Sequence, residues 1–312
     1  MIIERYSIEL RDKWNSFVEE SRNGTFLFNR GYMDYHSDRF EDFSLIMRDN
    51  KGNIIALLPA NREGDIICSH RGLTYGGWIL GHKKPDANIM SEGWDATLEF
   101  LRQSGISGIE YRPVPHIYHR YPAEEDLYGL LQKGARILPS PVSSVIDLKN
   151  PVGFNENSRR GLALANRSGL TVRDSSDFRK YWEILSTLLK EKHSTKPVHT
   201  IEEIELLASR FPQNITLRAV FKDNEMIAGT VLFHCGNTVK CQYIASSPEG
   251  QHSGALAFLF NDLMNSLPET VRYLDAGTSN RGIQQELNAG LLSQKAGFGA
   301  RAVIYPRFIL TF

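Results

Sequence analysis

The feature that most constrains this chain is an order of strands and helices that occurs twice along it. Each half carries an Asp-Asn turn between two apolar runs, RDNKGNIIALL at residues 48–58 and KDNEMIAGTVL at residues 222–232. Aspartate and asparagine tolerate left-handed backbone dihedral angles, so both turns predict β-hairpins. A chain that repeats such a unit is expected to build the same sheet twice.

A helix and a further strand follow each hairpin. Apolar residues at helical spacing predict a helix over 87–103 and another over 254–266. The first leads to a strand at 108–112 and the second to a strand at 271–275. This order predicts an α+β fold, in which helices pack on a mixed sheet.

The segment between the two halves carries helix signals of its own. Thr200 and Glu203 have the spacing of a capping box, which opens a helix to about Arg210. Two earlier helices are predicted over 159–167, after the capping residues 155–158, and over 177–192.

Length and composition narrow the class of protein. The 312 residues are enough for two domains with separate cores, which we place at 1–150 and 151–312. Lysine plus arginine equals aspartate plus glutamate, 36 each, and this zero net charge argues against bulk nucleic-acid binding, with DNA excluded as a partner.

Targeting and cysteine signals are also weak. The chain has no run of the ~20 apolar residues that a membrane span needs, so no membrane insertion is expected. Its first residues include acids and lack the apolar segment of a signal peptide. Cys68, Cys235 and Cys241 have no metal-binding or redox spacing, so we expect no metal and a cytoplasmic location.

Five passages carry a resemblance to a known family. They are SRRGLALANRSGLTV (158–172), EKHSTKPVHTIEEIELLASRFP (191–212), IAGTVLF (227–233), QYIASSPEGQHSGALAFLF (242–260) and LNAGLLSQKAGFGAR (287–301). The second half resembles an acyltransferase of the GNAT superfamily, and the tandem arrangement resembles the Fem-type (FemABX-like) branch. The resemblance implies two tandem GNAT-like domains, each a mixed twisted sheet flanked by helices. It also implies that the second is catalytic and that the first is non-catalytic and lies on the acceptor side.

The same resemblance implies a function. We expect an N-acyltransferase that moves an acetyl-like group from acyl-CoA to an amine on a cell-envelope or surface-glycan precursor. The acyl-CoA would be a co-substrate, with no tightly bound cofactor. A Fem-type aminoacyltransferase that uses aminoacyl-tRNA and a peptidoglycan precursor is the alternative. We favour acyl-CoA, because the chain shows neither a heptad-repeat arm nor a strongly basic face.

Two further classes of function stay open. One is a non-catalytic ligand-binding protein that has kept the fold, since a fold does not secure a function. The other is an RNA-binding module that uses the arginines between Arg159 and Arg173. The zero net charge counts against this RNA-binding module.

The donor site of the family is a loop of the pattern Arg/Gln-x-x-Gly-x-Gly/Ala that opens a helix. Its backbone N–H groups and the helix dipole hold the diphosphate of coenzyme A. Here the loop is Gln251-His-Ser-Gly-Ala-Leu256, which keeps the first glycine but has leucine at the sixth position. This partial match leaves aminoacyl-tRNA open as the donor. The donor contacts that the resemblance implies are Ala245, Ser246, Gln251, Gly254 and Ala255.

Acyl transfer to an amine needs a base and donors for the oxyanion of the tetrahedral intermediate. In GNAT enzymes this happens where the two central strands separate, which implies backbone donors around 243–246. We name Tyr243 as the catalytic side chain there, with a packed sheet tyrosine as the alternative. Asp275 ends a strand and is expected to orient the amine or act as base, or else to fix the loop. Glu286 is a further candidate base.

Substrate contacts are expected in the second half. Arg159 begins a helix, and its guanidinium suits phosphate or carboxylate, with a solvated helix face as the alternative. His193 and His199 are poor metal ligands without a third, so we expect acceptor contact or acid–base work, or surface histidines. The best-matching region adds Thr278, Asn288 and Lys295. Of these, the lysine is expected to meet an anionic substrate and the asparagine to fix the loop.

One loop of the first half is also a candidate. Tyr111 and His119 flank a proline-rich stretch, YRPVPHIYH, that begins at the end of a strand. Prolines hold such a loop extended, and its aromatic and imidazole groups are expected to face an acceptor cleft at the domain interface. A rigid structural loop is the alternative.

Overall fold

The computed structural model of this protein describes residues 1–193, 196–282 and 284–312. The chain divides into two compact units. Unit 1 contains Met1–Pro141 together with the segment Ile304–Phe312, which includes the last strand, and unit 2 contains Val142–Val303. The structure therefore places the boundary between Pro141 and Val142 and not at residue 150. It also places the end of the chain in unit 1.

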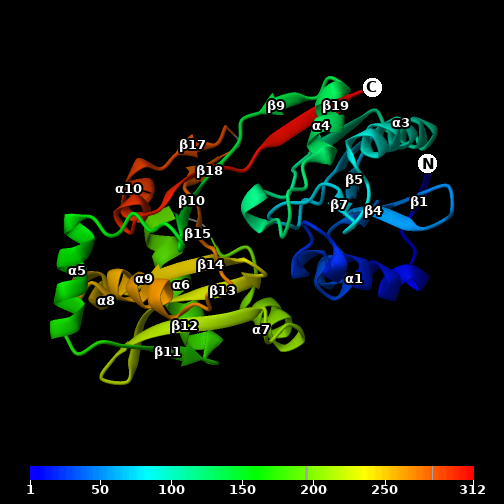
Figure 1. Cartoon of the computed structure of the whole chain (residues 1–312). Coiled ribbons are helices and arrows are strands. Elements are labelled where there is room, and N and C mark those ends of the chain that lie inside the picture. The colour runs from blue at the N-terminus through cyan, green and yellow to red at the C-terminus, as the bar shows by residue number, and fades with distance from the viewer. Residues whose placement is uncertain (194–195, 283) are drawn as a thin grey trace. The chain divides into compact units, whose positions relative to one another are not determined.

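Unit 1 is built on two sheets, of order β1-β3-β4-β7 and β2-β5-β6-β8-β19-β9 (Figure 1). Their strands are β1 (Ile2–Arg5), β2 (Glu41–Asp42), β3 (Leu45–Arg48), β4 (Ile54–Leu58), β5 (Asn61–Glu63), β6 (Ile66–Cys68), β7 (Ile79–Leu80), β8 (Gly108–Tyr111), β9 (Arg136–Leu138) and β19 (Arg307–Thr311). The α-helices are α1 (Arg11–Glu20), α2 (Arg30–Met33), α3 (Ala87–Gln103) and α4 (Glu125–Gln132).

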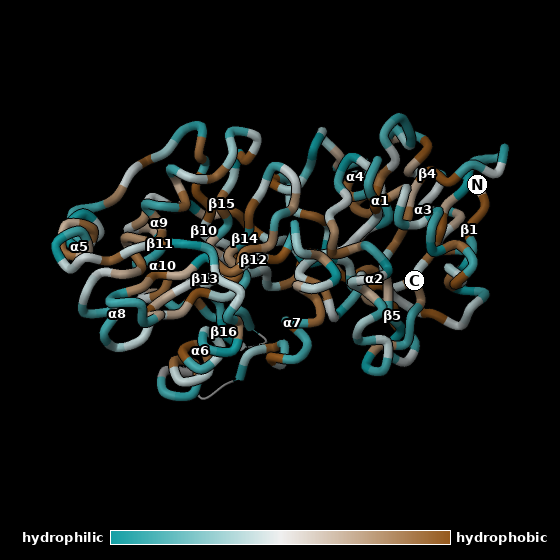
Figure 2. Tube along the Cα trace, turned by 90° about the horizontal axis from the view of Figure 1, so that it is seen from below, coloured by the Kyte–Doolittle hydropathy of each residue, from teal (hydrophilic) through white to brown (hydrophobic). Residues whose placement is uncertain are grey.

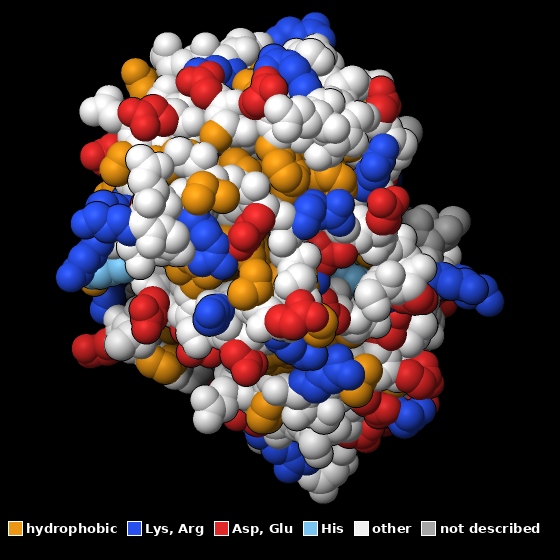
Figure 3. All heavy atoms as spheres, turned by 90° about the vertical axis from the view of Figure 1, so that its right-hand side faces the viewer, with side chains coloured by type: hydrophobic (Ala, Val, Ile, Leu, Met, Phe, Trp, Pro, Cys, Tyr) orange, Lys and Arg blue, Asp and Glu red, His pale blue; other side chains and the backbone are white. Residues whose placement is uncertain are grey.

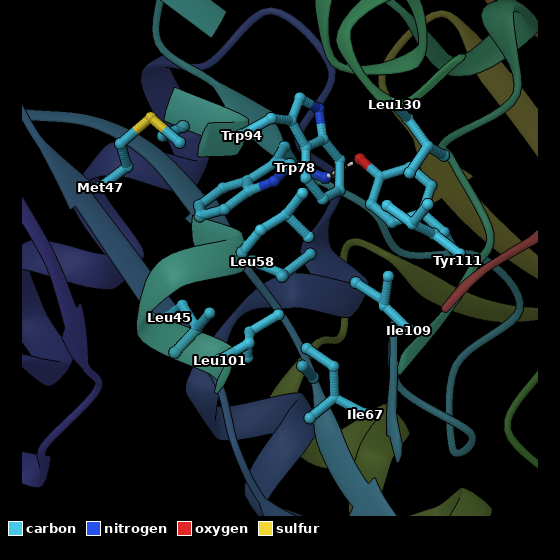
Figure 4. Packing of buried hydrophobic residues seen from close by; sticks show 14 of the residues in the cluster. Leu45, Met47, Leu58, Ile67, Trp78, Trp94, Leu101, Ile109, Tyr111 and Leu130 are labelled. Carbon is cyan, nitrogen blue, oxygen red and sulfur yellow. Dashed lines mark hydrogen bonds between the residues drawn. The ribbon is translucent and has the colours of Figure 1, made fainter. Parts of the chain in front are cut away.

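Large aromatic side chains fill the core of unit 1 (Figure 4). Trp78, Trp94 and Tyr111 are fully buried there. The Tyr111 hydroxyl accepts a hydrogen bond from the Trp78 backbone N–H at 2.6 Å and donates one to the carboxylate of Asp126. Burial raises the pKa of Asp126 to about 7. The core of unit 1 therefore contains a buried hydrogen-bonded pair, Tyr111 and Asp126, which has a structural role.

Unit 2 is built on one seven-stranded sheet of order β11-β12-β13-β14-β15-β10-β18. The strands of unit 2 are β10 (Val142–Asp147), β11 (Thr171–Ser175), β12 (Ile215–Lys222), β13 (Glu225–Cys235), β14 (Thr238–Ser246), β15 (Tyr273–Thr278), β16 (Asn280–Arg281), β17 (Glu286–Leu287) and β18 (Arg301–Ile304). Its helices are α5 (Glu156–Arg167), α6 (Phe178–His193), α7 (Ile201–Arg210), α8 (Pro248–His252), α9 (Ala255–Ser266) and α10 (Ala289–Gly297).

The core of unit 2 lies between its sheet and α9, with α5 packed against α9 (Figure 1). Alternate residues of a strand face opposite sides, and Val239, Cys241 and Leu274 face this core. Helix α6 packs on β13 and β14 and buries Tyr181 and Leu185. In Figure 2 the brown stretches follow the strands of each unit, whereas the exposed turns are mostly teal.

In each unit, one strand pairs with strands that are far away in the sequence. In unit 2, β10 lies between β15 and β18, although it directly follows β9 of unit 1 in the sequence. In unit 1, β19 lies between β8 and β9 and pairs antiparallel with both. The order helix, strand, helix, strand occurs in both units, as α3-β8-α4-β9 and α9-β15-α10-β18. The predicted α+β fold built twice is confirmed.

Candidate functional site

The two central strands of unit 2 pair over only a short distance. Parallel pairing of β14 and β15 runs from Thr238↔Tyr273 to Lys240↔Asp275 and then stops, although both strands continue. On its other side β14 stays paired with β13, with a bulge that leaves Gln242 without a partner residue. The predicted separation of the central strands is therefore present, and it begins at Lys240 and Asp275.

Buried charges lie where the strands separate. Paired residues of parallel strands point to the same face, and Lys240 Nζ lies 3.5 Å from Asp275 Oδ2. Asp275 is fully buried and accepts hydrogen bonds from the Ser143 hydroxyl and from the Gly277 N–H, the latter at 2.9 Å. A buried carboxylate needs such partners, because an unpaired charge in the interior is costly.

Lys295 joins this group from α10. Its Nζ donates to the carbonyl oxygens of Gly277 and Thr278, each at 2.9 Å, at the point where β15 has left β14. Burial lowers the pKa of Lys295 to about 8, with Asp275 acting in the opposite direction and Lys240 adding to the fall. Two lysines around one carboxylate leave a surplus positive charge beside the gap.

Tyr243 is held by its neighbours on the α6 side of the sheet. Its hydroxyl lies 2.5 Å from Nδ1 of His199 and accepts a hydrogen bond from the His199 N–H at 3.2 Å. The Tyr181 hydroxyl donates to the Tyr243 carbonyl at 2.9 Å, and the Trp182 ring meets the Tyr243 ring edge-on. Burial raises the pKa of Tyr243 to about 12, so at neutral pH this phenol is a donor and not a base.

The start of α9 is covered by α5. Gly254 has a φ of +76°, and a Cβ atom there would lie 2.2 Å from the carbonyl oxygen of Gly161 in α5. Ala255 is fully buried. Gly254 is therefore packed tightly against α5, and the donor contacts at Gly254 and Ala255 stay predictions.

A cavity of about 220 Å³ lies between α6, the first residues of β13 and the end of β14. Ser246 and Gln251, two of the predicted donor contacts, line it, whereas Ala245 is buried. The charged lining residues are Lys180, Glu183, Glu191, Glu225 and Glu249. This predominantly acidic lining opposes the binding of a diphosphate.

The other predicted residues of unit 2 have varied positions. The side chain of Asn288 caps α10 by accepting a hydrogen bond from the Leu291 N–H at 3.2 Å. Thr278 is exposed, and its backbone carbonyl accepts a hydrogen bond from Lys295. Glu286 is exposed in β17. Arg159 is exposed and donates to the Phe154 carbonyl at 2.9 Å. His193 ends α6, and its side chain lies outside the described residues.

The two predicted residues of unit 1 hold structure together. Tyr111 is fully buried in the core, with its hydroxyl bound to Trp78 and Asp126. His119 is buried and its Nε2 lies 2.9 Å from the Val114 carbonyl oxygen. The predicted substrate contact through Tyr111 is corrected for this reason, and the alternative of a rigid loop describes both residues.

Three residues of the gap were not anticipated from the sequence. Lys240 lies within β14, and its position between the apolar residues Val239 and Cys241 is the sequence signal that could have identified it. Ser143 comes from β10, whose position in this sheet depends on long-range pairing. Tyr181 looked like one more apolar residue of a helix face. In the part of the chain that the structure describes, no cluster of three or more metal-ligating side chains is present.

Comparison with known proteins gives one match to a domain family. The sequence profile of the acetyltransferase (GNAT) domain matches residues 154–284, which include α5–α9 and the strands on both sides of the gap. No curated protein sequence matches the chain.

Solved structures match over the whole chain. FemX has a TM-score of 0.71 at 13% identity, covering 100% of this chain and 98% of that one. L-PGS from Bacillus licheniformis has a TM-score of 0.60 at 12% identity, covering 100% and 93%. A tandem GNAT protein from the clavulanic acid biosynthesis pathway has a TM-score of 0.51 at 12% identity, covering 99% and 98%. At these identities the likeness shows the fold, which is that of tandem GNAT domains. Among the described residues, no helix is long and apolar enough to cross a membrane.

Proposed function

Because the acetyltransferase (GNAT) domain profile matches residues 154–284 and the fold is Fem-like, we propose that this chain is a GNAT-type acyltransferase that joins an acyl group to an amine where β14 and β15 separate. The observation that carries the proposal is the end of β14–β15 pairing at Lys240 and Asp275, with the buried ammonium of Lys295 beside it. The gap between two strands can accommodate an extended donor beside backbone groups that no longer pair across it. Buried charge in such a gap acts strongly on a developing oxyanion.

The chemistry assigns a role to each charged group. The neutral amine attacks the donor carbonyl, a C–N bond forms, and the bond from the carbonyl carbon to the leaving oxygen or sulfur breaks. With a pKa of about 8, Lys295 is mostly charged at pH 7 and stabilises the oxyanion of the intermediate. Asp275 pairs with Lys240, and its charge favours the charged form of Lys295. The amine proton leaves through solvent to the departing group, with Tyr243 and His199 positioned as a donor pair nearby.

The proposal keeps the predicted roles of the two units, with catalysis in unit 2 and the acceptor bound on the side of unit 1. In unit 1 the hairpin β5–β6 lies beside β8, with parallel pairs such as Ile67↔Ile109. The core next to this pair is filled by Trp78 and Trp94. This packing supports catalysis by unit 2 alone, with unit 1 serving the acceptor.

For the donor, we choose an aminoacyl ester such as aminoacyl-tRNA over acyl-CoA. The loop at which coenzyme A would place its diphosphate opens a helix, and here it has Leu256 at the sixth position of the family pattern. The likeness in fold to FemX and L-PGS agrees with this choice. The acceptor is the amine of a cell-envelope or surface-glycan precursor, and a cytoplasmic location belongs to the same proposal.

Transfer assays with labelled donors test the proposal. Wild-type protein is incubated with amine-bearing precursors and either labelled aminoacyl-tRNA or labelled acetyl-CoA. We expect an amide product from aminoacyl-tRNA that falls about 100-fold or more in Lys295→Met, the loss typical of an oxyanion donor. Lys149→Met, at an exposed lysine of the same unit, is the matched control and keeps full activity.

Each other outcome has a defined meaning. A product from acetyl-CoA alone would keep acyl transfer and reverse the choice of donor. Equal activity in wild type and Lys295→Met would refute the site. Tight donor binding with no product over the whole acceptor panel would support the non-catalytic alternative.

A further inference from the structure

Three arginines of unit 1 surround a single glutamate. Glu110 lies between Ile109 and Tyr111 of β8, and since both neighbours are in the core, its side chain points to the opposite face of the sheet. Arg112 follows two residues later, Arg307 comes from the adjacent β19, and Arg71 comes from the segment after β6. We call these four residues the Glu110 cluster.

The contacts of the Glu110 cluster converge on one oxygen. Nitrogen atoms of Arg71, Arg112 and Arg307 lie 3.0, 3.0 and 2.9 Å from Oε1 of Glu110. A second nitrogen of Arg112 lies 3.2 Å from the same oxygen, and Arg71 also reaches Oε2 at 2.8 Å. These arginines lower the pKa of Glu110 against the effect of its burial.

The cluster has more donors and more positive charge than its glutamate can satisfy. An ionised carboxylate offers about four acceptor sites, whereas each guanidinium carries five N–H donors. Glu63 pairs with Arg71 at 3.0 Å from an exposed position, which still leaves three positive charges against two negative ones. Arg307 Nε is buried and has no hydrogen-bond partner among the residues that the structure describes.

The strand register adds a second sign of a missing anion. Phe308 of β19 pairs with Tyr111 of β8, so the next residues along, Arg307 and Arg112, stand side by side on the same face. Like charges opposite each other on neighbouring strands are unfavourable. Oε1 of Glu110 binds both guanidiniums but carries only one negative charge with Oε2, so a further anion beside them would offset the repulsion that remains.

The cluster is within reach of solvent. The side chains of Arg71, Arg112 and Arg307 are 30%, 23% and 18% exposed, against 11% for Glu110. A small anion can therefore contact the guanidiniums without displacing the core. On the face shown in Figure 3, basic and acidic side chains are interspersed and no wide basic area is present.

We propose that the Glu110 cluster is a binding site for a phosphoryl group. Planar guanidinium forks match the oxygens of phosphate in pairs, and a doubly charged phosphate balances the surplus better than a carboxylate does. The ligand is a phosphate-bearing small molecule that reaches the outer face of the six-stranded sheet of unit 1. This site does not depend on the proposed function, because its evidence and its test involve binding alone.

Titration with inorganic phosphate tests the site. Binding is measured by calorimetry and by thermal shift, with chloride at matched ionic strength as the reference. We expect saturable binding to the wild type. Arg112→Gln and Arg71→Gln each weaken it about ten- to hundredfold, the loss of a charge-assisted hydrogen bond. Glu110→Gln removes the internal competitor and tightens it. Arg48→Gln is the matched control, since Arg48 has a one-to-one partner in Glu4 elsewhere in unit 1.

Three results would overturn the proposal. The first is no saturable binding up to about 50 mM phosphate, where a millimolar site would be full. The second is equal loss of affinity in Arg48→Gln and in the folded cluster variants. The third is acetate binding as tightly as phosphate, which would remove the assignment to a phosphoryl group. Having two arginine variants keeps the test decisive if one of them does not fold.

Discussion

The buried carboxylate of Asp275 offers the sharpest test of the gap as a charged site. The change Asp275→Asn keeps the shape of the side chain and its ability to accept from Ser143, but it removes the carboxylate that pairs with Lys240 and favours the charged form of Lys295. Removing one partner of a buried ion pair costs about 3–5 kcal/mol, because the other charge stays buried and uncompensated.

The loss is measured as a shift in the melting temperature of unit 2. For a domain of this size, 1 kcal/mol corresponds to roughly 2–4 °C, so we expect a fall of about 6–20 °C by scanning calorimetry at pH 7. The change Asp174→Asn is the control, because Asp174 is 78% exposed and pairs with Arg218 at the surface. Such a pair contributes about 0–1 kcal/mol.

The effect has a defined dependence on pH. Without Asp275, the pKa of Lys295 falls below its value of about 8, while the unfolded chain keeps a lysine pKa near ~10.4. Between these two values the unfolded state binds more protons, so stability rises with pH. The variant should therefore recover part of its stability on going from pH 7 to pH 9.

A second substitution completes the cycle. Adding Lys240→Met to Asp275→Asn removes one of the uncompensated charges and should restore at least about half of the lost stability. A single variant that loses less than about 1 kcal/mol, or a double variant that loses as much as the single one, would refute the reasoning.

Three further predictions concern the same unit. Gly254→Ala should cost about 1–3 kcal/mol more in urea unfolding than Gly169→Ala, because both have positive φ but only Gly254 meets the backbone of Gly161; equal costs would contradict the contact. Tyr243→Phe should cost about 1–3 kcal/mol by leaving the His199 N–H unsatisfied, and an unchanged stability would argue against that bond. The kcat of the wild type should decline above pH 8 as Lys295 loses its proton, and Lys295→Arg, if active, should lack this decline.

The local parts of the fold could be predicted from the sequence, because local chemistry determines them. Thr200 and Glu203 form the predicted capping box, and the helix that they open ends at Arg210 as expected. The hairpin turns at Asp49 and Asp223 connect the strands that the apolar runs predicted. Each of these features depends on residues that are close together in the chain.

The positions of β10 and β19 in their sheets and the burial of Tyr111 could not be predicted in this way. Nothing local in β10 or β19 shows which sheet each strand completes, because that depends on pairing with strands far away in sequence. The burial of Tyr111 and the covering of Gly254 by Gly161 have the same origin. Asp275 and Lys295 were named from the sequence, yet their link to Lys240 required β14 and β15 to be neighbours.

The most direct measurement of the central claim is a crystal structure with a stable donor analogue, such as an aminoacyl amide of 3′-amino-adenosine. We predict that its carbonyl oxygen lies between β14 and β15, within hydrogen-bond distance of Lys295 Nζ. An analogue bound away from the gap, with the space beside Gly277 filled by protein side chains, would contradict the account.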